Sequence, residues 1–196
     1  MTDHGIGRLL VASLHQSIGD VMPTRLEYYE HWLSPMGLRD GRSGLAPLGA
    51  VLSFLRQEGE PAYAAVMTTA GRYAADWRHQ GGVGRRLPGW MPKRLRRGAA
   101  LRDIKGLLRA SYQPLAVTIA LERGTGTVTL DGSVFCALRE PWPWPTCTFV
   151  ASALTRHLEL HGLEATVAID DCRAQSGTGG CRLLVTFEPA TAEVTT

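Results

Sequence analysis

Apolar residues recur at helical spacing through the first half of the chain. In the segment IGRLLVASLHQSI, the residues Ile6, Leu10, Leu14 and Ile18 lie four positions apart. This spacing places them on one face of a helix. The same period predicts four more helices, over residues 23–33, 45–59, 61–77 and 91–111.

After Pro114 the period of the apolar positions changes to two. Segments rich in Val, Thr and Ile alternate with glycine-containing turns, which is typical of strands. We expect these strands over residues 115–122, 126–130, 133–140, 164–172 and 181–189. One further helix is predicted over residues 146–162, with Thr146 as its N-cap and Gly162 as its stop.

Helices followed by strands predict an α+β fold, in which N-terminal helices pack on an antiparallel sheet. We expect residues 1–113 to form the helical part of one domain and residues 114–189 to form the sheet with its single helix. Residues 190–196 are expected to be a flexible tail. With 196 residues, 44% of them apolar, the chain can build one substantial core.

Charge is distributed unevenly along the chain. The net charge is only +3, but residues 85–109 hold nine Lys or Arg and one Asp. The basic helix at 92–111 could meet an acidic partner or an anionic surface, or it could be an ordinary solvated face. Motifs for nucleic-acid recognition are missing and aromatic residues are not interleaved with the basic ones, so nucleic acid is not an expected partner.

The sequence predicts a cytoplasmic protein. No apolar run approaches the roughly 20 residues of a membrane helix, so no integral membrane segment is expected. The first residues, MTDHGIGRLL, carry an acid and a histidine where a signal peptide would be basic.

Four cysteines are the main candidates for chemistry. Cys136 is expected late in a strand, Cys147 at the start of a helix, and Cys172 opposite Cys181 across the last hairpin. A helix N-terminus favours the thiolate, which is the form that binds zinc. A metal site and buried free thiols are both compatible with this spacing. A disulfide is disfavoured in a reducing compartment.

The run GSVFC, PTCTFVASALTRHL and VAIDDCRAQSGTGGCRLLVTF resembles a 4-vinyl reductase domain. The resemblance implies a mixed fold like that of TRAPP subunits, often dimeric, with an apolar ligand cavity. The family includes a protein linked to vinyl-group reduction in bacteriochlorophyll synthesis and the sensor domains of aromatic-responsive activators. In those sensor domains a zinc ion is held by three cysteines and a glutamate.

Transferred to this chain, the family's zinc ligands are Cys147, Cys172 and Cys181. The position of the glutamate is occupied by Ile169, which cannot bind a metal. Asp170, Asp171 or Cys136 would have to supply the fourth ligand, or the site is lost. Asp171 has the same strand parity as Ile169, so Asp171 and Cys136 are the two candidates kept. Cys136 would give an all-sulfur site, which suits zinc.

Aromatic residues suggest a cavity for a small apolar molecule, either aromatic or a tetrapyrrole. We expect it between the N-terminal helices and the sheet, with its entrance near PWPWP. The residues proposed to line it are Tyr63, Met67, Tyr73, Trp142 and Trp144. Packing in a solid core is the alternative for aromatics at helical spacing.

His157 and His161 have the i, i+4 spacing of metal ligands, but the glutamate between them is not placed as in HExxH. They are interpreted as surface or packing residues. Flavin, nicotinamide and nucleotide motifs are also missing. The sequence therefore favours a non-catalytic ligand-binding module with a structural zinc. The alternatives are a reductase or accessory protein of bacteriochlorophyll synthesis and a protein-binding adaptor.

Overall fold

The computed structural model describes residues 6–30, 33, 45–81, 90–112, 115–122, 124–138 and 141–188. The expected tail at 190–196 and the start of the basic stretch at 85–89 lie outside these residues. The helices of the first half are α1 (Arg8–Val21), η1 (Pro23–Arg25), α2 (Leu26–Glu30), α4 (Leu45–Gln57), α5 (Glu60–Gln80) and α6 (Lys93–Ser111). The second half holds β1 (Ala116–Glu122), β2 (Thr125–Asp131), η2 (Val134–Cys136), α7 (Thr148–Leu160), β3 (Ala165–Asp171), α8 (Arg173–Ser176) and β4 (Cys181–Phe187).

The four strands form one antiparallel sheet in the order β1-β2-β4-β3. Its two central strands bury every second side chain, for example Val128 and Leu130 on β2 and Leu183 and Val185 on β4. Residues between them, such as Thr129, are exposed. This period-two burial is the reason the strands could be recognised in the sequence.

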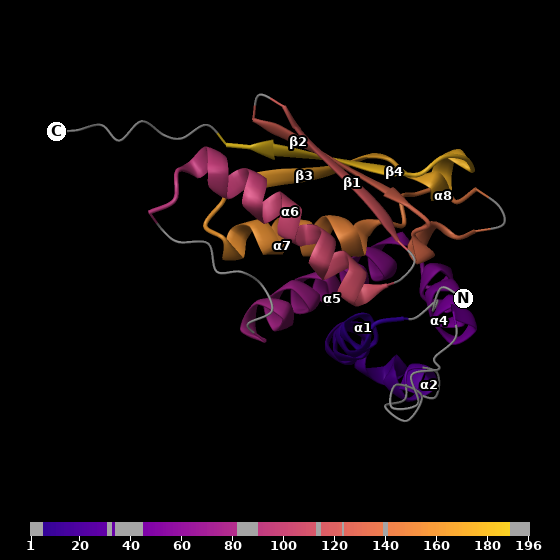
Figure 1. The fold of residues 1–196 in the computed structure, drawn as a ribbon. Helices are drawn as coiled ribbons and strands as arrows, with labels where there is room; N and C mark the ends of the chain where they lie inside the picture. The colour runs from indigo at the N-terminus through magenta and orange to yellow at the C-terminus, as the bar shows by residue number, and fades with distance from the viewer. Residues whose placement is uncertain are drawn as a thin grey trace, which may run out of the picture.

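Helices cover the apolar face of the sheet, so the predicted α+β class is confirmed (Figure 1). Helix α7 packs on β3 and α6 packs on β1. Helix α5 packs on α7, and α1 packs in turn on α5. We expected the segments with Leu55, Tyr63 and Met67 to cover the sheet directly. Instead α7 and α6 contact the sheet, and the face of α7 with Phe149, Val150 and Leu154 is fully buried.

The strand predicted over residues 133–140 is wrong for residues 133–138, and residues 139–140 lie outside the described part of the chain. Gly132 has a φ of 77°, which turns the chain out of β2. The short 3-10 helix η2 follows, and Val134, Phe135 and Cys136 are all buried in succession. An alternating strand with one solvated face would bury only every second residue. Cys136 therefore lies in η2 rather than late in a strand.

The basic helix α6 uses part of its charge within the molecule. The guanidinium of Arg97 lies 4.8 Å from the ring centre of Phe187 and donates to the carbonyl of Glu188 at 2.9 Å. Lys93 and Arg94 are exposed at the start of the helix. In the described part of the chain, no helix is both long and apolar enough to span a membrane.

Candidate functional site

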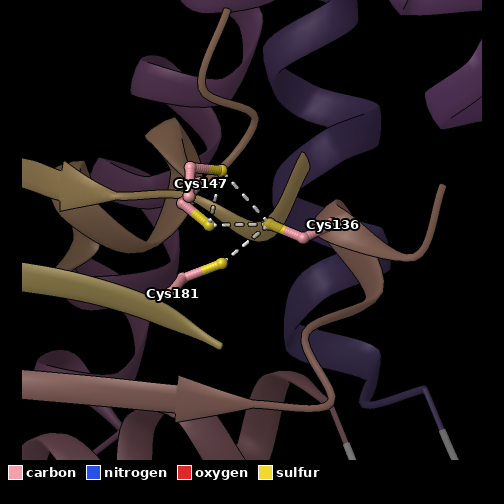
Figure 2. Close-up of side chains that lie close together, drawn as sticks. Cys136, Cys147 and Cys181 are labelled. Atoms are coloured by element: carbon pink, nitrogen blue, oxygen red, sulfur yellow. Dashed lines mark hydrogen bonds between the residues drawn. The ribbon is translucent and has the colours of Figure 1, made fainter. Parts of the chain in front are cut away.

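All four cysteines meet in one buried cluster. Cys136 comes from η2, Cys147 is the N-cap of α7, Cys172 is the N-cap of α8 and Cys181 is the first residue of β4. Their sulfur atoms lie within 4.8 Å of one another. Figure 2 shows the labelled side chains of Cys136, Cys147 and Cys181 pointing toward a common centre.

The sulfur distances exclude a disulfide in this structure. Cys136 Sγ lies 2.8 Å from Cys147 Sγ and 3.0 Å from Cys181 Sγ. Cys172 Sγ lies 3.6 Å from Cys136 Sγ and 3.7 Å from Cys147 Sγ. A covalent S–S bond is about 2.0 Å long, and all four cysteines are free.

Hydrogen bonds between the thiols of the cluster shift their pKa values in opposite directions. A hydrogen bond with Cys136 lowers the pKa of Cys172 below its ordinary value. A hydrogen bond with Cys136 also raises the pKa of Cys181 and of Cys147. The cluster therefore releases its first proton more readily than an isolated cysteine and its last protons less readily.

The structure separates the two candidates for the fourth ligand. Asp171 is exposed and is not part of the cluster, because the register of β3 against β4 shifts between Ile169 and Asp171. That shift invalidates the parity argument that placed Asp171 on the side of Ile169. Cys136 is the fourth member of the sulfur cluster. It could not be recognised from strand spacing, because η2 brings it in from outside the sheet.

Thr146 and Tyr63 support the cluster. The Thr146 hydroxyl donates to Cys136 Sγ at 3.4 Å and lies 3.9 Å from Cys172 Sγ, so Thr146 contacts the sulfurs and is not the N-cap of α7. The Tyr63 hydroxyl donates to the Thr146 carbonyl at 2.9 Å. Burial raises the pKa of Tyr63, which keeps its hydroxyl protonated as the donor.

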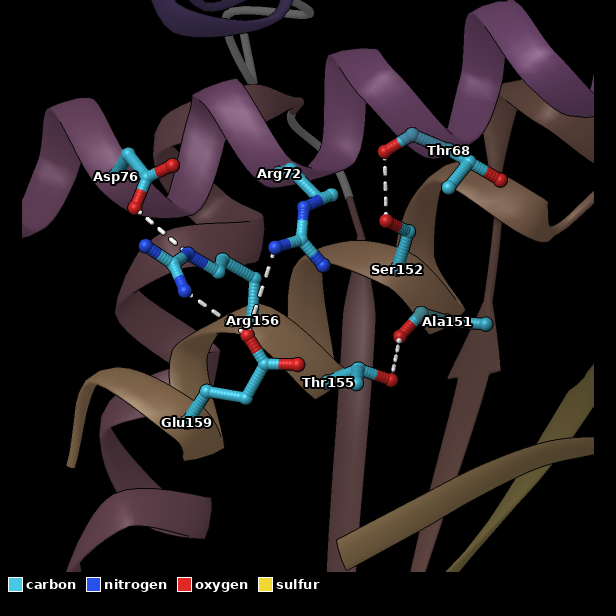
Figure 3. A network of polar contacts seen from close by, with 8 residues as sticks. All are labelled: Thr68, Arg72, Asp76, Ala151, Ser152, Thr155, Arg156 and Glu159. Carbon is cyan, nitrogen blue, oxygen red and sulfur yellow. Dashed lines mark hydrogen bonds and ion pairs between the residues drawn. The ribbon is translucent and has the colours of Figure 1, made fainter. Parts of the chain in front are cut away.

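The seam between α5 and α7 fixes the helix that starts at Cys147 (Figure 3). The Ser152 hydroxyl donates to the carbonyl of Thr68 at 2.6 Å. Arg156 donates to Asp76 at 2.8 Å and to Glu159 at 2.9 Å. These polar contacts connect α5 to the middle and the C-terminal half of α7.

A cavity of about 280 Å³ lies beside the cysteine cluster. Its lining comes from α4, from the end of α6 and from η2: Ala46, Gly49, Leu52, Arg56, Tyr112, Val134 and Ala137. Val134 and Ala137 lie on either side of the segment that carries Cys136, so the cavity wall and the cluster share a backbone.

Arg56 is the one charged residue in that lining. It is only 7% exposed, and its Nη1 has no hydrogen-bond partner among the described residues. Its guanidinium carbon lies 5.9 Å from the ring centre of Trp142. The indole N–H groups of Trp142 and of Trp144 are also buried without a partner in the described part of the chain. Arg56 Nη1 is therefore an unpaired donor in the cavity wall, and Trp142 lies next to this guanidinium.

The five residues predicted to line the ligand site do not come together. Tyr63 and Met67 are fully buried in the core. Tyr73 stacks on Trp77 and donates to Asp20 at 2.5 Å, away from the cavity. Trp142 and Trp144 do pair, with ring centres 5.3 Å apart, and only Trp142 reaches Arg56. Arg56 itself was missed, because a charged residue near the end of a helical pattern is typical of a surface position.

A second depression of about 470 Å³ is lined by Arg25, Tyr28, Tyr29, Phe54, Gln57 and Glu58. Its two charged residues already satisfy each other, since Arg25 Nε lies 3.2 Å from Glu58 Oε1. Its charged groups are therefore not free to recognise a charged ligand. The smaller cavity at Arg56 is therefore the better candidate for binding.

His157 and His161 are buried rather than on the surface, and they lie against Asp103 of α6. Burial lowers the pKa of His157 to about 4, so that its ring is neutral at neutral pH. The interpretation of the two histidines as packing residues is therefore correct in that both side chains are buried. The spacing alone did not reveal the carboxylate from α6.

No protein-family model matches the chain, and no curated protein matches it either. Among solved structures, an H-NOX protein from S. oneidensis in the Fe(II)NO ligation state has a TM-score of 0.60 at 10% identity, covering 94% of this chain and 100% of the other. A mutant H-NOX protein from S. oneidensis in the Fe(II) state has a TM-score of 0.59 at 11% identity, covering 94% and 97%.

The phenol-responsive sensory domain of the transcription activator PoxR, solved with phenol, has a TM-score of 0.50 at 16% identity. This match covers 72% of this chain and 73% of the other. At such low identities the likeness establishes the fold alone. The chain shares its fold with these domains.

Proposed function

We propose that this protein is a ligand-sensing domain that binds a small aromatic molecule carrying an acidic oxygen. The observation that carries the proposal is the cavity of about 280 Å³ with buried Arg56 in its wall. The PoxR sensory domain, which shares the fold, responds to phenol. The 4-vinyl reductase resemblance, which extends to aromatic-responsive sensors, supports the same class of ligand.

The cavity size favours one ring over a tetrapyrrole. An engineered protein cavity of about 150 Å³ binds benzene, and typical ligand pockets range from about 300 to 1,000 Å³. A cavity of about 280 Å³ therefore suits a single substituted ring. Leu52 and Val134 offer apolar contacts to the ring, while the guanidinium of Arg56 offers donors to its oxygen.

The second part of the proposal is a structural zinc ion held by Cys136, Cys147, Cys172 and Cys181. Tetrahedral Zn–S bonds of about 2.3 Å place sulfur atoms roughly 3.8 Å apart. The distances of 3.6 and 3.7 Å at Cys172 are close to that spacing, and the two shorter distances at Cys136 would lengthen around an ion. Four thiolates form a closed donor set, which is typical of structural rather than catalytic zinc.

Zinc and cavity are mechanically connected in this arrangement. The ion would fix η2 through Cys136, and η2 supplies Val134 to the cavity wall. The guanidinium of Arg56 carries a positive charge, and it lies in the cavity wall that is next to the negatively charged zinc–thiolate centre. A ligand that draws Arg56 toward its own oxygen would alter that electrostatic contact, which gives a sensor a route from the cavity to the metal centre.

The proposed cavity can be filled by one substitution at Gly49. This residue lies in its wall, and a Cβ placed there would meet no atom within 4 Å. Gly49→Phe should therefore occupy the cavity, keep the fold and abolish binding of benzoate and phenol in isothermal titration calorimetry. Gly49→Ala serves as the control, because it adds helix propensity of about 0.5–1 kcal/mol with only one methyl group of volume. Equal benzoate affinity in Gly49→Phe and the unsubstituted protein would place the site elsewhere.

Arg56 should determine which aromatic molecules bind. We expect benzoate and phenol to bind more tightly than toluene, which has the same ring and no oxygen. Arg56→Met should weaken benzoate binding by about tenfold to a hundredfold, since charge-assisted hydrogen bonds contribute about 1.5–3 kcal/mol. Toluene binding should change little, because the methionine stem preserves apolar volume. If the substitution weakens both ligands equally, Arg56 has no role in recognising the oxygen.

A further inference from the structure

Asp103, His157 and His161 form a second cluster of ligating side chains, at the opposite end of α7 from Cys147. Asp103 belongs to α6, His157 to the last turns of α7, and His161 to the turn that follows. One ligand atom from each lies within 4.8 Å of the others. At a rise of roughly 1.5 Å per residue, ten residues of α7 separate His157 from Cys147 by about 15 Å.

The two histidines are enclosed by protein. His157 is 4% exposed and His161 is 7% exposed. His79 packs edge-on against His161, with ring centres 5.8 Å apart, and the ring centres of His157 and His161 are 4.6 Å apart. Water therefore has little access to groups that ordinarily require hydrogen-bond partners.

Two polar atoms of this cluster have no hydrogen-bond partner among the described residues: Nε2 of His161 and Oδ2 of Asp103. The distance from Asp103 Oδ2 to His157 Nε2 is 3.8 Å, too long for a hydrogen bond. Asp103 Oδ2 and His161 Nε2 thus lie in one cluster with His157 and do not pair within it. Such a gap between electron-pair donors fits an ion that accepts from all of them.

The outer contacts of the cluster are those that metal ligands need. Asp103 Oδ1 lies 3.5 Å from Nη2 of Arg78, which orients the carboxylate and leaves Oδ2 free. His157 Nε2 lies 3.2 Å from the carbonyl of Ala100. When His157 Nε2–H donates to that carbonyl, the tautomer is fixed and Nδ1 is the ring nitrogen that keeps a lone pair for an ion.

We propose that Asp103, His157 and His161 bind a divalent transition-metal ion. Two imidazoles and one carboxylate are a donor set used for Zn²⁺ and for Fe²⁺. The site is chemically distinct from the all-sulfur cluster, since it contains only nitrogen and oxygen donors. It would link α6 to the end of α7, and it does not depend on the cavity at Arg56.

Co²⁺ is the probe that distinguishes the two sites. The full chain, purified without chelator, is dialysed against Co²⁺, and its metal content and visible spectrum are measured. We expect one additional cobalt per chain, with d–d absorption and no thiolate-to-cobalt charge-transfer band. Failure to take up cobalt, or uptake of no more cobalt than the thiolate charge-transfer band of the cysteine cluster accounts for, would overturn the proposal.

Asp103→Asn and His161→Gln should each weaken the uptake of cobalt at least tenfold. His15→Gln is the matched control, because His15 also lies near a carboxylate, Glu30, at 3.4 Å but outside the cluster. It should leave uptake unchanged. Unaltered uptake in both cluster variants would refute the assignment.

Paramagnetic broadening in the unsubstituted protein keeps the test decisive if a variant misfolds. Ring resonances of His157 and His161 should broaden on addition of Co²⁺, and those of His15 should not. Sharp resonances of both cluster histidines under cobalt saturation would refute the site without any substitution.

Discussion

Cys147→Ser should remove the bound zinc and lower the free energy of unfolding by several kcal/mol. Metal binding to a structural site is coupled to folding, and apparent zinc affinities in small peptides correspond to about 10 kcal/mol or more. Zinc content by elemental analysis and urea denaturation would measure the two effects. This substitution does not weaken the helix start, because Cys147 is the N-cap of α7 and serine is itself a favourable N-cap. Any loss therefore comes from the sulfur cluster and not from the helix start.

Chelation provides the internal control for this result, because every cysteine of the chain belongs to the cluster. A strong chelator should lower the melting temperature of the unsubstituted protein and leave that of Cys147→Ser nearly unchanged. Protein purified without chelator that contains no zinc, and whose stability does not respond to chelator, would show that the cluster is a group of packed thiols.

Gly71→Ala should destabilise the protein by about 2–3 kcal/mol, although alanine is normally the better helix residue. Gly71 lies where α5 meets α7. A Cβ there would lie 2.4 Å from the carbonyl oxygen of Phe149 and 2.8 Å from the amide nitrogen of Ala153. Both are backbone atoms of a helix, so the two helices would have to move apart. That movement would stretch the hydrogen bond from Ser152 to Thr68 (Figure 3).

Gly98→Ala is the matched comparison, since Gly98 is also inside a helix and its Cβ would meet only side-chain ends at ordinary contact distance: Arg102 Nη2 at 3.6 Å and Leu121 Cδ2 at 3.9 Å. It should raise the free energy of unfolding by about 0.5–1 kcal/mol. Thermal denaturation of both variants tests the opposite signs. The same stabilising sign at Gly71 would mean that α5 and α7 are not in close contact in solution.

The parts of the fold that the sequence could predict are those determined by local period. Ile6, Leu10, Leu14 and Ile18 mark α1 because a helix repeats its buried face every three to four residues. Similar patterns located α5 and α7. The segment around Cys136 follows neither the helical period nor the period of two that marks a strand. All three residues of η2 are buried, so buried and exposed positions do not alternate there.

Residues of the candidate site were predictable only where they stand at the start of a helix or a strand. Cys147, Cys172 and Cys181 stand at the starts of α7, α8 and β4, which turn signals reveal. Arg56 and Asp103 have the polar character of surface residues, and each faces inward only because another helix or segment packs over it. Such long-range placement has no signature in a single sequence.

The position of Cys181 on the last strand described has a consequence for how the protein matures. During synthesis the N-terminal parts of a chain fold first, and the pairing of β2 with β4 brings together residues far apart in the sequence. The thiols of Cys136, Cys147 and Cys172 must therefore wait, reduced and without their fourth partner, until β4 has emerged. In that interval they are open to oxidation, so the yield of folded protein should depend on the reducing capacity and the zinc supply of the cell that makes it.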